Sequence, residues 1–274
     1  MTIKIEKSPL MEKLEEEKKK IMEKLSKIKY RFIVYSGKGG VGKSTISAGL
    51  AYGLSKLGTT GILDADITGP NIYKMLGALE PLYGENNEII PIEVNGLKLV
   101  SLGLILPEGQ PVIWRGPLRT GAIRQFIKDV RWGELDFLVA DLPPGTGDEA
   151  ITVFQDLSPH ATIVVTTPQK IALMDAQRTI TMARNMGVKK IYLIENMSYL
   201  KCPKCGHKID LYGRGSAKDL AKKMGVTFLG EVPLVPEIIK AADNGMLIEE
   251  LEKLEIGKIF ENIAKKLVED VKSS

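Results

Sequence analysis

Two lysines share one glycine-rich run, Gly37-Lys38-Gly39-Gly40-Val41-Gly42-Lys43-Ser44-Thr45. Lys43, Ser44 and the flanking glycines match the pattern G-x-x-x-x-G-K-[ST], in which backbone N–H groups surround nucleotide phosphates at a helix N-terminus. An apolar run, Arg31 to Ser36, precedes the pattern, and Ile46 to Lys56 follows it with helical spacing. This strand–loop–helix context predicts that residues 37–45 bind a nucleotide, and a glycine-rich turn without a ligand is the alternative.

Two carboxylates, Asp64 and Asp66, lie at the end of the apolar run Thr60 to Asp64. Open α/β sheets bind ligands at the carboxyl ends of their strands. Phosphoryl transfer needs a group that positions the attacking water, and we predict this role for Asp66. Asp64 is predicted to be structural or an outer partner of Mg²⁺. For both residues, capping of the following helix is the alternative.

A third carboxylate, Asp141, ends the apolar run that begins at Phe137. Four apolar residues followed by Asp form a Walker B arrangement, in which the carboxylate holds Mg²⁺, usually through water, beside the Ser44 hydroxyl. Asp148 and Glu149 follow after a Pro-Pro-Gly-Thr-Gly turn. They are better explained as helix-start residues than as catalytic acids.

The two cysteines of the chain, Cys202 and Cys205, are spaced two residues apart. Pro203 and Gly206 predict a turn that lets both sulfurs face one metal. Two thiolates are half of the four that an iron–sulfur cluster or a structural Zn²⁺ takes, and a two-fold axis near the loop would supply the other half. His207 as an added Zn²⁺ ligand, thioredoxin-like exchange and inert thiols remain alternatives.

Short apolar, β-branched runs alternate with helical stretches along the chain. The expected fold is α/β: a three-layer, doubly wound, mostly parallel sheet with helices on both faces, of the P-loop NTPase type. A hairpin is expected from Ile89 to Leu102, around an Asn95-Gly96 turn. The other expected strands are Thr60–Asp64, Phe137–Asp141, Ala161–Thr166, Lys190–Glu195 and Thr227–Gly230.

Both ends of the chain show amphipathic helical patterns. Residues 1–30 are predicted to be a leader with one helix over Pro9 to Ile28 that docks on the body, and residues 31–274 are predicted to be the ATPase domain. Glu252 to Lys272 has one apolar side, but its lysines are balanced by acidic residues. This balance favours a docked helix over a membrane-surface anchor.

Composition narrows the class of protein further. The 274 residues are 44% hydrophobic and carry a net charge of +4 from many charges of both signs. No apolar stretch is long enough to span a bilayer, and no secretory signal is visible. We therefore expect a cytoplasmic protein that binds neither nucleic acid nor membrane.

Several motifs taken together resemble one known family. They are the glycine-rich run, Asp64-Ala-Asp-Ile-Thr-Gly-Pro70, Trp114-Arg-Gly-Pro117, Asp141-Leu-Pro-Pro-Gly-Thr-Gly-Asp148, Thr166-Thr-Pro-Gln169, Glu195-Asn-Met197 and the cysteine pair. Between Arg31 and Gly245 the chain resembles the Mrp/ApbC family of iron–sulfur cluster carrier ATPases. With Lys38, the loop resembles the deviant P-loop of the MinD/ParA branch of P-loop ATPases. Unlike eukaryotic members, it has no cysteine near the N-terminus.

The resemblance implies a homodimer that binds ATP and Mg²⁺ and hydrolyses ATP slowly as a switch. Lys38 would reach the partner subunit's nucleotide, with a solvated loop lysine as the alternative. Asn196 would contact the adenine, with a turn-forming residue at a strand end as the alternative. Cys202 and Cys205 of both subunits would hold a labile [4Fe-4S] cluster for transfer to apo-proteins. A ParA/MinD-like positioning ATPase and a zinc-bridged regulatory ATPase are the alternatives. The role of Trp114 to Arg119 is left open: these residues could contact a client protein, the partner subunit or only solvent.

Overall fold

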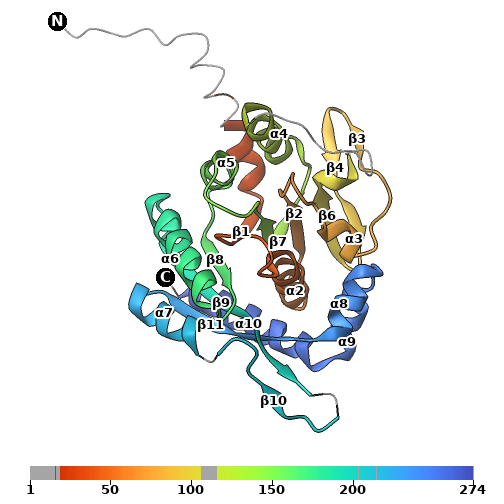
Figure 1. Ribbon diagram of the computed structural model, residues 1–274. Coiled ribbons are helices and arrows are strands. Elements are labelled where there is room, and N and C mark those ends of the chain that lie inside the picture. The colour runs from red at the N-terminus through yellow and green to blue at the C-terminus, as the bar shows by residue number, and fades with distance from the viewer. Residues whose placement is uncertain (1–15, 17–18, 106–115, 203, 214, 274) are drawn as a thin grey trace, which may run out of the picture.

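A nine-stranded, mostly parallel sheet forms the centre of the computed structural model, which describes residues 16, 19–105, 116–202, 204–213 and 215–273. The strand order is β10-β9-β8-β1-β7-β2-β6-β5, and β11 pairs with β9 (Figure 1). Only β5 and β10 pair antiparallel to their neighbours in this sheet. The strands are β1 (Ile28–Tyr35), β2 (Thr60–Asp64), β5 (Ile92–Val94), β6 (Leu97–Ser101), β7 (Leu135–Asp141), β8 (Ala161–Thr166), β9 (Lys190–Lys201), β10 (Lys208–Ile209) and β11 (Thr227–Leu234).

Helices cover both faces of the sheet, as Figure 1 shows. Side chains alternate along β1, so that Phe32 and Val34 join one core cluster and Ile33 and Tyr35 join the other. The first face carries α2 (Lys43–Ser55), α3 (Ile72–Met75), α8 (Pro236–Asp243), α9 (Leu247–Lys253) and α10 (Glu255–Lys272). The second carries α4 (Gly116–Asp129), α5 (Asp148–Leu157), α6 (Lys170–Asn185) and α7 (Ser216–Met224). The predicted three-layer α/β fold is confirmed.

The terminal helix α10 packs along α2. A Cβ atom added to Gly49 would lie 2.3 Å from the Phe260 ring, so the two helices approach as closely as a glycine permits. Ile263 and Leu267 of α10 are also buried. The predicted docked helix is therefore confirmed, although it starts at Glu255 because the preceding residue is extended. None of the helices in the described ranges has the length and apolar character needed to cross a membrane.

Several predicted strands have different bounds in the structure: β7 begins two residues earlier than predicted, at Leu135, and β11 ends four residues later, at Leu234. The run from Ile89 to Val94 is divided by Pro91, which has no N–H for a ladder. Its first half is β4 (Glu88–Ile90), which pairs with β3 (Tyr83–Glu85), and only β5 pairs with β6 across the Asn95-Gly96 turn. At the other edge, β9 continues six residues beyond Glu195 to Lys201. The first strand begins at Ile28, so the predicted boundary at residue 30 falls inside it.

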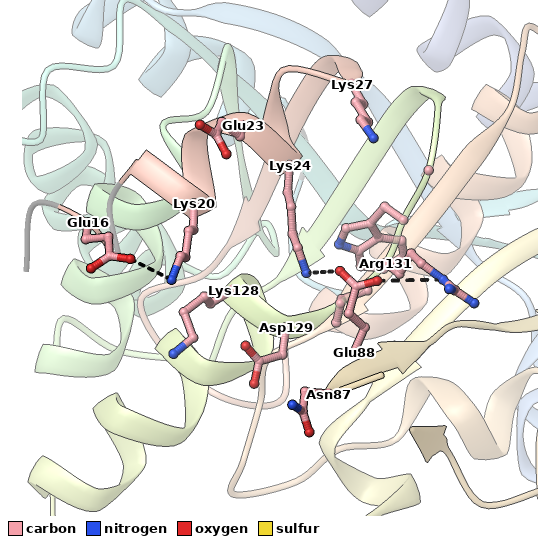
Figure 2. Close-up of a pocket in the computed structure, with 13 residues that line it drawn as sticks. Glu16, Lys20, Glu23, Lys24, Lys27, Asn87, Glu88, Lys128, Asp129 and Arg131 are labelled. Carbon is pink, nitrogen blue, oxygen red and sulfur yellow. Dashed lines mark ion pairs between the residues drawn. The ribbon is translucent and has the colours of Figure 1, made fainter. Parts of the chain in front are cut away.

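The described part of the leading segment is helical up to Leu25. Ile21 and Leu25 are buried in the second core cluster, so this part packs against the domain. Figure 2 shows the charged pocket beside it, about 760 Å³ in volume, where Lys24 Nζ lies 2.7 Å and Arg131 Nε 3.9 Å from Glu88. This pocket lies at the amino ends of β1 and β7, at the opposite end of the sheet from the glycine-rich loop.

Candidate nucleotide site and cysteine loop

The glycine-rich loop connects β1 to α2 in a conformation that requires glycine. Gly40 and Gly42 have φ angles of 80° and 79°, in the left-handed region. Gly37 is required for another reason, because a Cβ atom there would lie 2.6 Å from the Asp175 carbonyl oxygen of α6. The first turn of α2 contains no acidic residue, so the positive end of this helix is open to an anion.

Lys43 is buried among carboxylates. Its ammonium nitrogen lies 2.7 Å from Asp141 Oδ2 and 3.6 Å from Asp66 Oδ2, and the residue is only 6% exposed. Burial alone would lower the pKa of Lys43, but the charges of Asp141 and Asp66 outweigh it and hold the pKa above its usual range. The site thus holds a lysine that stays charged, next to the loop predicted to bind phosphate.

Asp141 is bound through both of its carboxylate oxygens. The Ser44 hydroxyl donates to Oδ2 at 2.8 Å, and the Ser47 hydroxyl donates to Oδ1 at 2.6 Å. The predicted neighbours Asp141 and Ser44 are therefore brought together. Ser47 was not predicted from the sequence, although it lies four residues after Lys43 and hence on the same face of α2.

Parallel register places Asp64 beside Asp141, since the two are Cα partners across β2 and β7. Asp64 is fully buried and accepts hydrogen bonds from the Ser101 hydroxyl at 2.9 Å and from the N–H groups of Asp66 and Ile72 at 3.3 Å. Burial, followed by the charge of Asp141, raises the pKa of Asp64 to about 7. Asp64 thus holds the loop after β2 in place, in line with its predicted structural role.

Asp66 uses its two oxygens differently. Oδ1 accepts hydrogen bonds from the Thr68 hydroxyl at 2.7 Å and from the N–H groups of Thr68 and Gly69 at 3.2 Å. Oδ2 is the atom that faces Lys43. One oxygen therefore fixes a turn while the other points into the phosphate site, and the role of orienting water stays a prediction.

Asn196 lies inside β9 and contacts the glycine-rich loop directly. Its side-chain Nδ2 donates to the Val41 carbonyl at 2.8 Å, and the residue is 5% exposed. This contact was not predicted, and the adenine contact stays a prediction. Lys38 is half-buried in the same loop, and its carbonyl accepts a hydrogen bond from Ser36 at 3.0 Å.

A buried tyrosine connects the loop after β7 to α6. The Tyr35 hydroxyl contacts the Gly145 carbonyl oxygen and lies 3.0 Å from the Met182 sulfur. Burial raises the pKa of this phenol, which keeps it a neutral donor. The alternation of β1 marks Tyr35 as a core residue, but no local pattern could show that its hydroxyl reaches residue 145.

The predicted helix start at Asp148 is confirmed, since α5 begins there. Arg119 Nη1 lies 3.0 Å from Glu149 Oε1 at this end of α5. Arg119 therefore has a partner within the chain. Trp114 and Arg115 lie outside the described residues.

The cysteine pair lies on a hairpin loop, as predicted. Cys202 follows β9 directly, its N–H donates to the His207 carbonyl at 2.9 Å, and its own carbonyl accepts from the Gly206 N–H at 2.8 Å. Cys202 is half-buried and Cys205 is exposed. Hydrogen bonds from the backbone N–H groups of Cys205 and Lys204 lower the pKa of the Cys202 thiol, which favours the thiolate that binds metal. Pro203 lies outside the described residues.

One strand carries contacts to both sites. β9 holds Asn196 against the glycine-rich loop and ends at Lys201, next to Cys202. Residues 196–201 between these points are not regular extended chain, because Met197 has a left-handed φ of 52°. The glycine-rich loop and the cysteine hairpin are nevertheless joined by a single strand.

The fold, the left-handed glycine loop and the buried lysine define a nucleotide-binding protein of the P-loop class. Residues 27–268 match the model of a family described as "NUBPL iron-transfer P-loop NTPase", and the chain belongs to this family. It is 48% identical over 266 residues to an iron-sulfur cluster carrier protein of Pyrococcus horikoshii, covering 92% of this chain and 90% of the relative. It is 41% identical over 262 residues to the cytosolic Fe-S cluster assembly factor CFD1 of Candida glabrata, covering 90% of this chain and 92% of the relative.

Solved structures agree with this family. A nucleotide-binding protein of Archaeoglobus fulgidus in complex with ADP superimposes with a TM-score of 0.76 at 38% identity, covering 85% of this chain and 93% of the other. The cell division ATPase MinD of Pyrococcus furiosus superimposes with a TM-score of 0.63 at 19% identity, covering 88% of this chain and 99% of the other. The likeness to MinD concerns the fold alone.

Proposed function

We propose that this protein is an ATP-dependent carrier of iron–sulfur clusters in the cytoplasm. It accepts a labile [4Fe-4S] cluster between two identical subunits and passes it to apo-proteins. The observation that carries the proposal is the position of β9, which joins the glycine-rich loop at Asn196 to the cysteine pair at Cys202. The names of the relatives from Pyrococcus horikoshii and Candida glabrata support the same function.

The cluster is cargo, and its ligands come from both subunits. Each chain supplies two thiolates, while a [4Fe-4S] cluster takes four. A two-fold axis at the hairpin needs only one such patch per subunit. The exposed Cys205 leaves one ligand open to an acceptor thiolate, which suits a cluster that must leave.

The nucleotide site supplies the switch. Lys43 and the loop N–H groups bind the phosphates, Lys38 reaches the partner subunit's nucleotide, and Asp66 orients water for slow hydrolysis of ATP. The oxygen set of Asp141 and Ser44 fits a hydrated Mg²⁺, because it places a buried carboxylate and a hydroxyl within 2.8 Å of each other. Bound there, Mg²⁺ would neutralise phosphate charge.

Anaerobic reconstitution tests the cargo. The wild-type dimer is expected to take up about four iron and four sulfide, and Cys202→Ala is expected to take up neither. His207→Ala is the matched control on the same loop and is expected to load as wild type does. Zinc bound without iron at the four cysteines would replace this proposal with the zinc-bridged regulatory ATPase.

Cluster transfer tests the switch. We expect Lys43→Ala, which cannot hold ATP, to load its cluster normally and to transfer it to an apo-protein at a changed rate. The assay follows activation of an apo-enzyme with and without ATP and Mg²⁺. Identical transfer rates for wild type and Lys43→Ala would show that the two sites are not coupled.

A further inference from the structure

An apolar groove of about 440 Å³ lies directly beside Cys202. One wall is the cysteine hairpin itself, with Tyr199 and Lys208, and the other is formed by the β11–α8 junction and the start of α10. Val235 and Ile259 are half-buried within this second wall. Whatever binds beside Cys202 must therefore lie at the mouth of this groove.

The same hairpin carries apolar side chains that point away from the core. Ile209, Leu211 and Tyr212 are 40%, 41% and 44% exposed, although they follow one another within four residues. In Figure 1 the hairpin with β10 extends beyond the rest of the domain. Four residues span at most about 13 Å, and the turn at Gly206 shortens the distance from Cys205 to Ile209, so this segment can reach a groove that begins at the other subunit's Cys202.

We propose that two copies of the chain interlock, with residues 209–212 of each subunit docked in the groove of the other. The inference rests on the proposed function, because the second pair of cysteines has to come from a second copy. That copy brings its own hairpin to the groove mouth at Cys202. In a two-fold contact the same operation fills both grooves, so each subunit covers its partner's apolar surface.

Charge favours the same arrangement. The groove is lined by Glu237 and Glu255 and also by Lys201 and Lys208, whereas Lys204 lies on the hairpin outside this lining. Within one subunit, Lys201 lies 3.0 Å from Glu255 and Lys208 lies over the Tyr199 ring. The described residues give Lys204 and Glu237 no ion pair, which leaves both able to pair across the two-fold axis.

The test uses paired charges in the full-length, cluster-loaded protein, with the dimer dissociation constant measured by analytical ultracentrifugation. Leu211→Lys and Val235→Glu are each expected to raise this constant at least tenfold, because each places a charge in the apolar contact. The double variant is expected to return to within about threefold of wild type, since the two charges meet across the axis. Ile239→Lys, on the exposed side of α8, is the matched control and is expected to change nothing.

A second readout does not depend on the cluster. Replacing both native cysteines by serine gives a cysteine-free chain, into which Leu211→Cys or Val235→Cys is introduced. When the two versions are mixed with ATP and Mg²⁺ and oxidised, a disulfide between the chains requires Cα atoms within about 7 Å. We expect this product, and at least tenfold less of it when Ile239→Cys replaces Val235→Cys.

The outcomes separate the interlock from the proposed function. Unchanged dissociation constants in both single variants, a double variant no better than the singles, or no cross-link would overturn the interlock. Normal dimers that transfer clusters slowly would assign the groove to the recipient protein and also overturn it. A dimer that depends on Leu211 but holds zinc and no iron would support the interlock and refute the proposed function.

Discussion

Replacing Gly42 with alanine tests whether β9 fixes the shape of the glycine-rich loop. Gly42 has a φ of 79°, and a Cβ atom there would lie 2.2 Å from Asn196 Nδ2. Since Asn196 is only 5% exposed, its amide has to shift within a packed region and gives up its hydrogen bond to Val41. The substitution therefore combines backbone strain with the loss of a buried hydrogen bond.

The size of the effect follows from these two parts. A left-handed alanine costs about 1 kcal/mol or somewhat more. Leaving a buried amide and a carbonyl without partners costs about 1–3 kcal/mol. We expect Gly42→Ala to lower the free energy of unfolding by about 3 kcal/mol and Asn196→Ala to lower it by about 1–2 kcal/mol. In the double variant the hydrogen bond is lost only once, so the two effects should fall short of additivity by about 1–2 kcal/mol.

Urea unfolding of wild type, the two single variants and the double variant measures this departure from additivity. Nucleotide affinity should also fall in the three variants, because the glycine-rich loop is distorted. Gly40→Ala is a matched control: its φ is 80°, but nothing lies within 4 Å of the added Cβ atom. It should cost the strain alone and be additive with Asn196→Ala. Additivity within about 0.5 kcal/mol for Gly42→Ala and Asn196→Ala would refute the reasoning.

Three further predictions concern stability. Gly49→Ala should lower the free energy of unfolding by about 1–3 kcal/mol, because the added Cβ atom would meet the Phe260 ring. Nucleotide affinity should not change, and an unchanged urea midpoint would contradict the prediction. The pKa of Asp64 is raised from 3.8 to about 7 by burial and the charge of Asp141, so between these values the folded chain holds a proton that the unfolded chain has released. The contribution of Asp64 to stability should therefore be fully present below this range and fall as pH rises through it, by up to about 1.4 kcal/mol per unit. Unfolding of Asp64→Asn at pH 4 to 7 should show a flatter profile. The pKa of Asp136 is lowered, chiefly by a hydrogen bond from a lysine, so its contribution is present above its usual pKa and is lost as pH falls, and Asp136→Asn should show less loss of stability in acid than wild type.

Much of the fold could be predicted because its signals are local. The buried strands β2 and β8 have the predicted bounds, since both are short apolar runs that end at polar residues. The P-loop could be predicted for the same reason, as its glycines and Lys43 lie within nine residues. Pro91 was also a local signal, and it shows why the predicted hairpin was too long.

Local sequence signals could not predict the length of β9 or the contacts within the nucleotide site. Residues 196–201 of β9 are polar or mixed, and they remain a strand because β10 and β11 pair with them. Asn196 and Val41 are 155 residues apart, so their hydrogen bond depends on the order of the strands in the sheet. Likewise Asp64 lies next to Asp141 only because β2 and β7 pair in that register.

The sequence alone determined which groups can do chemistry: a glycine loop with two lysines, three aspartates at strand ends and one pair of cysteines. These groups can be recognised from residue type and from short spacings along the chain, because residues close in sequence stay close in the folded protein. Only the tertiary structure decided that Lys43 is enclosed by two of those aspartates, that Asn196 holds the loop, and that one strand runs from the nucleotide site to Cys202. Such contacts join distant residues, and strand order, register and burial fix them together.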